Sequence, residues 1–206
     1  MSSAIIGLIA GTLVVLAVLS LVWGTQYLVI RLAQADVPPW RAVALRFAVV
    51  AIVGQAAVVV TRPTAPPGRR AARVAMGATQ AISMGLLYAG QQHLPSALAS
   101  VLMATTPVLV AVIAHRALDE RAAPHAFLVG VIGLGGIALI SGARLTEGVS
   151  AIGLVLLLGA AVASAVSKTI GKAVADLPIA ILLRDLGAAA ALAALGASIV
   201  LEHDAP

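Results

Sequence analysis

Long apolar stretches alternate with short polar breaks along almost the whole sequence. Each stretch is close to the roughly 20 residues that an α-helix needs to cross a lipid bilayer. The breaks contain proline, glycine and charged residues, which end helices and form turns. The pattern predicts an all-α, polytopic membrane helix bundle with about seven transmembrane helices, over residues 9–30, 41–60, 71–90, 97–115, 125–141, 149–170 and 178–201.

The composition agrees with a chain that lies mostly in lipid. Apolar residues make up 61% of the 206 residues and charged residues only 10%, whereas soluble domains carry roughly 25% charged residues. The mean hydropathy is +1.08. There is no cysteine, which excludes disulfides and cysteine-ligated zinc. The first apolar stretch lacks a preceding basic region and exceeds the core of a signal peptide, so we interpret it as a retained helix.

The positions of lysine and arginine predict the orientation in the membrane, because cytoplasmic loops are enriched in these residues. With the N-terminus in the cytoplasm, eight basic residues fall in the inside loops and three in the outside loops. The inside set is Arg62, Arg69, Arg70, Arg73, Arg116, Arg121, Lys168 and Lys172, and the outside set is Arg31, Arg41 and Arg144. Membrane topology therefore explains the net charge of +5, and we expect no nucleic-acid partner.

Two segments of the sequence, residues 20–46 and 164–184, resemble each other weakly. Residues 23–31 can be aligned with residues 164–172. The alignment then places three further pairs close together: Asp36 with Asp176, Pro39 with Pro178, and Arg46 with Arg184. The two copies lie five predicted helices apart, and an odd number means that they enter the membrane from opposite sides. This is the inverted repeat that is common among secondary transporters.

Several short motifs follow one another in the predicted helices. The first two helices carry Trp-Gly-Thr at 23–25, Val-Pro-Pro at 37–39 and Ala-Leu-Arg-Phe at 44–47. The next two carry Leu-Tyr-Ala-Gly at 87–90, Leu-Pro-Ser-Ala-Leu-Ala-Ser at 94–100 and Thr-Pro at 106–107. Leu-Asp-Glu-Arg at 118–121 then precedes a helix with Gly130, Gly133 and Gly136. In this order and spacing, the motifs resemble those of EamA-type transporters of the drug/metabolite transporter superfamily.

The resemblance implies an architecture and a function. Such transporters have ten helices in two inverted five-helix repeats and move small metabolites across the membrane. Residues 1–145 would form the first repeat, and residues 146–206 the first two helices of an incomplete second repeat. We therefore expect an EamA-like exporter or facilitator of small metabolites in a bacterial inner (plasma) membrane. The alternative is a non-transporting or partner-dependent fragment of such a transporter. The partner would be a second copy in a homodimer or the missing helices of the second repeat.

Polar and aromatic residues inside the predicted helices are the candidates for substrate binding. Arg46 lies roughly 8 Å into the second helix, where a charge is costly unless it faces a cavity. Gln80, Met84 and Tyr88 recur on one face of the third helix. The full candidate set is Trp23, Gln26, Tyr27, Arg46, Gln80, Ser83, Met84 and Tyr88.

We predict that five of these side chains converge on a central cavity, namely Trp23, Gln26, Arg46, Gln80 and Tyr88. The competing interpretation is that they make hydrogen bonds between helices, with Arg46 extending to the membrane surface. Aromatic rings combined with a few amides and hydroxyls suit a small amphipathic molecule. The expected partners are therefore a small-molecule substrate and the lipid bilayer.

Three further features of the helices lead to predictions. The Thr-Thr-Pro sequence at 105–107 lies in the middle of the fourth helix, where proline frees a backbone carbonyl and can kink the helix. Arg184 and Asp185 are adjacent and point about 100° apart on a helix, so we expect them to pair with other helices rather than with each other. The Ala- and Gly-rich stretch 187–196 is expected to be exposed, because its packing partner is missing.

A membrane-embedded metal-dependent enzyme is a weaker interpretation. His115, Asp119, Glu120 and His125 lie in one predicted cytoplasmic turn and could ligate a metal. The resemblance accounts for the Asp-Glu-Arg of this turn, and the sequence has no Gly-x-Ser-x-Gly or His-Glu-x-x-His motif. We expect no catalytic residue, metal or cofactor. Asp185 is the only acidic residue within a predicted helix, so uniport or facilitated exchange is favoured over ion coupling.

Overall fold

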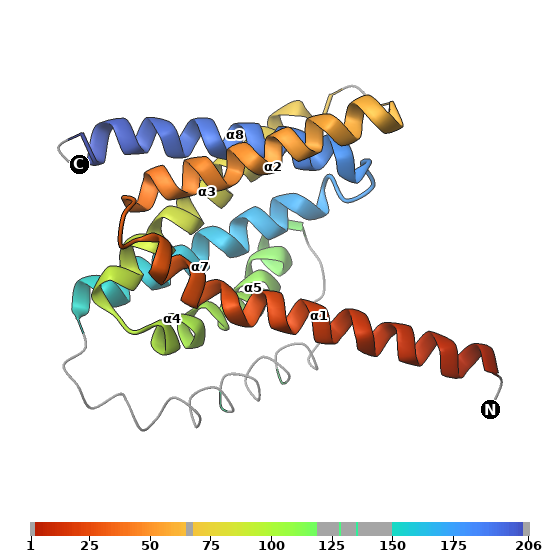
Figure 1. Cartoon of the computed structure of the whole chain (residues 1–206), viewed down its shortest axis with the longest axis horizontal. Helices are drawn as coiled ribbons and strands as arrows, with labels where there is room; N and C mark the ends of the chain where they lie inside the picture. Colours follow the sequence, from red (N-terminus) through yellow and green to blue (C-terminus); the bar gives the residue numbers. More distant parts are fainter. Residues whose placement is uncertain (1–2, 65–67, 119–127, 129–134, 136–149, 204–206) are drawn as a thin grey trace.

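The computed structural model of the chain is a bundle of α-helices (Figure 1). It describes residues 3–64, 68–118, 128, 135 and 150–203, and the statements below concern this part of the chain. The helices are α1 (Ser3–Ala33), α2 (Pro39–Thr61), α3 (Arg70–His93), α4 (Ser96–Met103), α5 (Thr106–Leu118), α7 (Ala151–Lys172) and α8 (Ile179–Leu201). The predicted all-α class is confirmed for the described residues.

Six of the seven predicted transmembrane helices coincide with observed helices, with α4 and α5 together occupying the fourth. The fifth, residues 125–141 with its three glycines, lies almost entirely outside the described residues. Five described segments are long and apolar enough to cross a membrane: Ile9–Ala33, Pro39–Thr61, Ser96–Ala117, Ala151–Lys172 and Ile179–Leu201. The third predicted helix, α3, is not in this set, because it carries two arginines and three glutamines.

The central position of α3 accounts for its polar composition. This helix packs along α7 and α8 and also contacts α2. Ten of its residues are buried, among them Ser83 and Gln91. Polar side chains in a membrane protein are tolerated where they face the interior of the bundle rather than lipid. The 24 residues of α3 extend over about 36 Å, which is enough to cross a bilayer.

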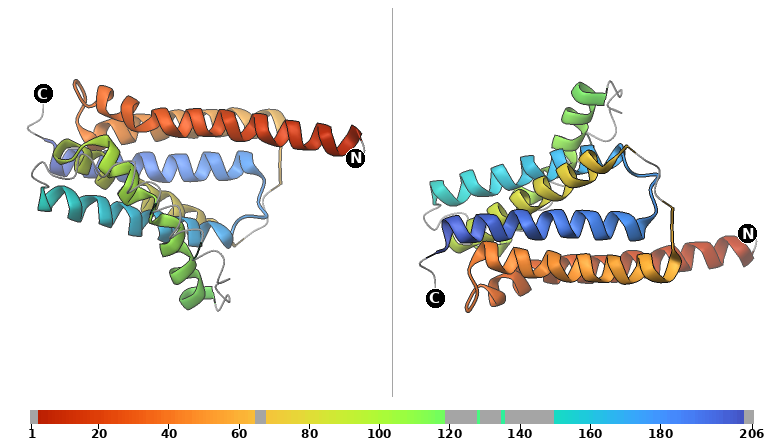
Figure 2. Two further views of the ribbon diagram at one scale, coloured as in Figure 1. Left: turned by 90° about the horizontal axis from the view of Figure 1, so that it is seen from below. Right: turned by 90° about the horizontal axis from the view of Figure 1, so that it is seen from above.

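The first helix is covered by far less protein than the others. Its main contacts are with α3 and α4, and every residue from 9 to 25 is exposed. Figures 1 and 2 show its N-terminal part extending beyond the other helices. The exposed side chains are almost all apolar, so this surface must meet lipid or a further helix rather than water.

The connection from α1 to α2 resembles the connection from α7 to α8. Each runs through a short turn to a proline, Pro38 or Pro178, that precedes a helix of 23 residues. Figure 1 shows α2 and α8 running in opposite directions, as do α1 and α7, and α2 packs along α8. An inverted repeat requires this geometry. The assignment of residues 1–145 and 146–206 to two repeats stays a prediction.

Glycine allows the backbones of α2 and α8 to touch where they cross. A Cβ atom added to Gly187 would lie 2.5 Å from the amide nitrogen of Ala51 and 3.0 Å from the carbonyl oxygen of Phe47. A Cβ atom on Gly54 would lie 2.7 Å from the Cα of Arg184. The expectation that the stretch 187–196 is exposed was therefore wrong for Gly187, which is buried against α2, and for Ala190 and Ala194, which are also buried, whereas Gly196 is exposed.

A break divides the fourth predicted helix into α4 and α5, and it falls where the Thr-Thr-Pro sequence predicted a kink. α4 ends at Met103, and α5 begins at Thr106 with Pro107 in its first turn. The hydroxyls of Thr105 and Thr106 donate to the carbonyls of Leu102 and Met103, both at 2.6 Å. The Leu102 carbonyl also accepts from the backbone amide of Thr105 at 3.2 Å, and Pro107 has no N–H to donate to the Met103 carbonyl.

Candidate functional site

Gln26 and Arg46, two of the predicted substrate-binding residues, meet between α1 and α2. A terminal nitrogen of Arg46 donates a hydrogen bond to the side-chain oxygen of Gln26 over 3.3 Å. Gln26 is half-buried and Arg46 is exposed. A guanidinium has five N–H donors, and Arg46 makes this one hydrogen bond with the described part of the chain. The described residues therefore leave most of its donors unused.

Tyr27, Met84 and Tyr88 lie together in the hydrophobic core between α1, α2 and α3. Met84 and Tyr88 are buried, and Tyr27 packs against the same cluster, which also contains Phe47 of α2. The backbone carbonyl of Tyr88 accepts a hydrogen bond of 2.7 Å from the side-chain nitrogen of Gln34, at the end of α1. The structure thus brings residues of the predicted set from α1 and α3 together in a packed cluster.

The other three predicted residues have different surroundings. Trp23 is 62% exposed, on the uncovered part of α1. Ser83 is fully buried and donates a hydrogen bond of 2.8 Å to the carbonyl of Ala160 on α7, as the helix-to-helix interpretation expects. Gln80 is half-buried on α3. None of the eight predicted residues lines either of the two cavities described below, and their role in binding stays a prediction.

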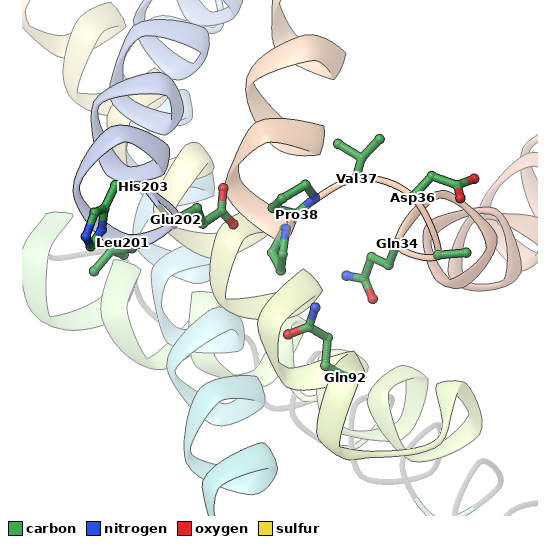
Figure 3. A pocket seen from close by; sticks show the side chains of 10 residues that line it. Gln34, Asp36, Val37, Pro38, Gln92, Leu201, Glu202 and His203 are labelled. Atoms are coloured by element: carbon green, nitrogen blue, oxygen red, sulfur yellow. The ribbon is translucent and has the colours of Figure 1, made fainter. Parts of the chain in front are cut away.

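One cavity of about 380 Å³ lies at the end of the bundle where α1 turns into α2 (Figure 3). Figure 3 shows the side chains of Gln34 and Gln92 turned toward the same space, with Glu202 and His203 on the other side. In the predicted orientation, this cavity faces the outside of the cell. The lining residues are Gln34, Ala35, Asp36, Val37, Pro38, Pro39, Gln92, Leu201, Glu202 and His203.

Glu202 is a structural residue of this end that the sequence pattern did not reveal. Its carboxylate accepts hydrogen bonds from the backbone amides of Trp40 at 2.7 Å and Arg41 at 3.1 Å, and from the hydroxyl of Ser198 at 2.8 Å. The first amides of α2 have no partner within the helix, and Pro38 provides no side-chain cap. Glu202 therefore caps α2 from the end of α8, where the positive end of the helix dipole stabilises its charge.

A cluster of ion pairs lies at the opposite end of the bundle. Asp185 of α8 accepts from Arg73 of α3 at 2.5 Å and from the adjacent Arg184 at 2.6 Å. Arg69 pairs with Asp176 and donates to the carbonyl of Ala173 at 3.1 Å, which joins the start of α3 to the turn between α7 and α8. The expectation that Asp185 pairs with another helix is confirmed.

The expectation that Arg184 and Asp185 do not pair with each other was wrong. The Nε atom of Arg184 reaches the carboxylate of Asp185 because the long arginine side chain can fold back over its neighbour, whatever the angle between the two Cβ positions. A second cavity, of about 500 Å³, lies beside this pair between α2 and α8. We call it the α2–α8 groove, and it is lined by Ala51, Ile52, Gln55, Arg184, Asp185 and Ala188.

The model of the EamA-like transporter family matches residues 8–142, which is more than half of the chain. The chain belongs to the EamA-like transporter family. It is an integral membrane protein of the drug/metabolite transporter superfamily, as the resemblance of its motifs predicted. The matched segment contains all eight predicted substrate-binding residues. Glu202 and the Arg184–Asp185 pair lie beyond it.

A solved crystal structure of another protein shares the fold of this EamA-like chain. The two are 22% identical with a TM-score of 0.66, and the match covers 88% of this chain and 63% of the other. The present chain therefore spans less than two thirds of that protein. No curated protein matches the sequence.

Membership of a transporter family agrees with the expectation that the chain is not an enzyme. Of the four candidate metal ligands, only His115 lies in the described part of the chain, while Asp119, Glu120 and His125 lie outside it. Across the described ranges, no three His, Cys, Asp or Glu residues are grouped to hold a metal ion.

Proposed function

We propose that this EamA-like protein moves small metabolites across a bacterial inner membrane as an exporter or facilitator, with its N-terminus in the cytoplasm. The family match over residues 8–142 carries the proposal. The opposite directions of the α1–α2 and α7–α8 pairs add support (Figure 1), because transporters with inverted repeats use that arrangement to open to either side.

The substrate site we propose lies where α1, α2 and α3 meet. Arg46 supplies a cation with unused N–H donors, which can bind a carboxylate or phosphate in bidentate fashion. Gln26 orients this guanidinium, and the rings of Tyr27 and Tyr88 lie on the neighbouring helix faces. A small anionic or zwitterionic metabolite with an apolar part suits this combination.

We propose transport without ion coupling. Both carboxylate oxygens of Asp185 already accept from arginines, so this residue is not available to a coupling cation. The other acidic residues of the sequence lie outside the predicted transmembrane helices.

A second candidate is a partner-dependent form of the same transporter, and the exposure of α1 supports it. α7, which would be the counterpart of α1 in the repeat, packs along α3 and contacts α5, whereas residues 9–25 of α1 are uncovered. A second copy of the chain in a homodimer, or helices that complete a second repeat, would cover α1.

The proposed site is tested by flux of labelled amino acids, organic acids and amines in proteoliposomes. We expect saturable flux for at least one class and its loss in Arg46→Gln. Arg31→Gln is the matched control, because Arg31 is an exposed arginine at the end of α1 and should leave flux unchanged. Full flux in Arg46→Gln would refute the substrate site, and equal loss in both variants would show a general effect of charge.

A further inference from the structure

The ion-pair cluster beside the α2–α8 groove has an excess of positive charge, although Arg73 itself does not line the groove. Arg73 and Arg184 share the single carboxylate of Asp185, so the cluster carries a net charge of about +1. Arg184 uses its Nε atom for that contact. Its two terminal nitrogens have no hydrogen-bond partner among the described residues, and the side chain is 35% exposed. A guanidinium in this state favours a bidentate anionic ligand.

The depth of Arg184 places this charge near the membrane surface. Arg184 lies five residues after Ile179, the first residue of α8, which corresponds to about 8 Å along the helix. An arginine side chain at this depth reaches the level of the lipid headgroups. The same end of the bundle holds Arg69 and the start of α3, which the charge pattern assigns to the cytoplasmic side.

Apart from Arg184 and Asp185, the lining of the groove is mostly apolar. Ile52 on its rim is 68% exposed, and Ala51 and Ala188 leave space because their side chains are small. Gln55 is the one uncharged polar side chain in the lining. A ligand that fills the groove therefore needs an anionic group next to Arg184 and a hydrocarbon part next to Ile52.

We propose that the α2–α8 groove is a binding site for an anionic phospholipid, whose phosphate is bound by the guanidinium of Arg184. Basic pockets between transmembrane helices on the cytoplasmic side are suited to such headgroups. The acyl chain lies along Ile52, on a surface that already meets the bilayer. A free phosphate ion would have the same contact with Arg184 but would lose its hydration without any gain at the apolar rim.

The test is titration of phosphatidylglycerol into the full-length protein in a neutral detergent, with the bound lipid counted by native mass spectrometry. We expect phosphatidylglycerol to bind in preference to phosphatidylcholine. Arg184→Gln should weaken phosphatidylglycerol binding by about tenfold or more, while Arg73 still pairs with Asp185. Arg70→Gln removes a basic residue at the same end of the bundle and should bind phosphatidylglycerol as the wild type does.

A second pair of variants tests the space in the groove without changing a charge. Ala188→Trp fills the space beside Arg184 and should lower binding, whereas Leu192→Trp, at a position 71% exposed on the same helix and outside the groove, should not. Wild-type binding in both Arg184→Gln and Ala188→Trp would overturn the proposal. Displacement of the lipid by equimolar glycerol phosphate would also overturn it, because the site would then recognise a free anion.

Discussion

The contact between the backbones of α2 and α8 leads to a prediction for Gly187→Ala. The new Cβ atom would lie 2.5 Å from the amide nitrogen and 2.9 Å from the Cα of Ala51. Two carbon atoms normally approach to about 3.5–4.0 Å, so the helices must separate by roughly 1 Å at this point. Both neighbours are backbone atoms and cannot rotate away.

The magnitude follows from two opposing effects. Overpacking of this kind costs about 1–3 kcal/mol, and alanine gains about 1 kcal/mol over glycine within a helix. Gly196→Ala on the same helix is the matched control, because a Cβ atom there has no neighbour within 4 Å. We expect Gly187→Ala to be less stable than Gly196→Ala by about 2 kcal/mol, or roughly 4–8 °C in melting temperature for a chain of this size.

The assay is thermal unfolding of both purified variants and the wild type in the same detergent, followed by intrinsic fluorescence or circular dichroism. We expect Gly196→Ala to melt at or slightly above the wild-type temperature and Gly187→Ala clearly below it. If Gly187→Ala melts at or above the temperature of Gly196→Ala, the two helices are not in backbone contact, and the α2–α8 pairing described above is incorrect.

Three further predictions concern the ends of the bundle. Asp185→Asn leaves Arg73 buried without a full counter-charge and should lower the free energy of unfolding by about 3–5 kcal/mol. Asp176→Asn breaks an exposed pair and should lower it by less than about 1 kcal/mol. Equal unfolding temperatures for the two variants would contradict this difference. Glu202→Ala removes the cap of α2 and should lower the free energy of unfolding by about 1–2 kcal/mol in the same assay. An unchanged melting temperature would show that the cap is dispensable. Single cysteines in the loop 62–68, introduced into this cysteine-free sequence, should resist impermeant thiol reagents in intact cells, and ready labelling would reverse the orientation.

Hydropathy was sufficient to predict the helices but not how they pair. The boundaries of α2, α7 and α8 follow from apolar length and from prolines such as Pro38 and Pro178, which are local properties of the sequence. The kink before Pro107 is local too. Gly187 is buried because it packs against Ala51 of α2, more than one hundred residues earlier in the chain. Composition and hydropathy do not predict which helices far apart in the sequence pack together.

The partners of the charged residues could not be predicted from the sequence either. The charge pattern assigns Arg73 to a loop because it lies near the start of a helix, yet it is only 8% exposed and pairs with Asp185. The capping role of Glu202 was also missed. A helix that begins after proline, without Ser, Thr, Asp or Asn as its cap, needs an acceptor from elsewhere; the sequence could have indicated that need but not which residue meets it.

The proposed transport function is tested most directly by counterflow in proteoliposomes. Vesicles are loaded with one unlabelled metabolite at a time, the same metabolite is supplied outside in labelled form, and the protein-to-lipid ratio is varied. We predict saturable, protein-dependent accumulation of at least one small metabolite, with a rate per protein that falls on dilution if a second copy completes the bundle. Correctly folded protein that gives no accumulation above protein-free vesicles for any metabolite, at any protein density, would contradict the assignment as a transporter.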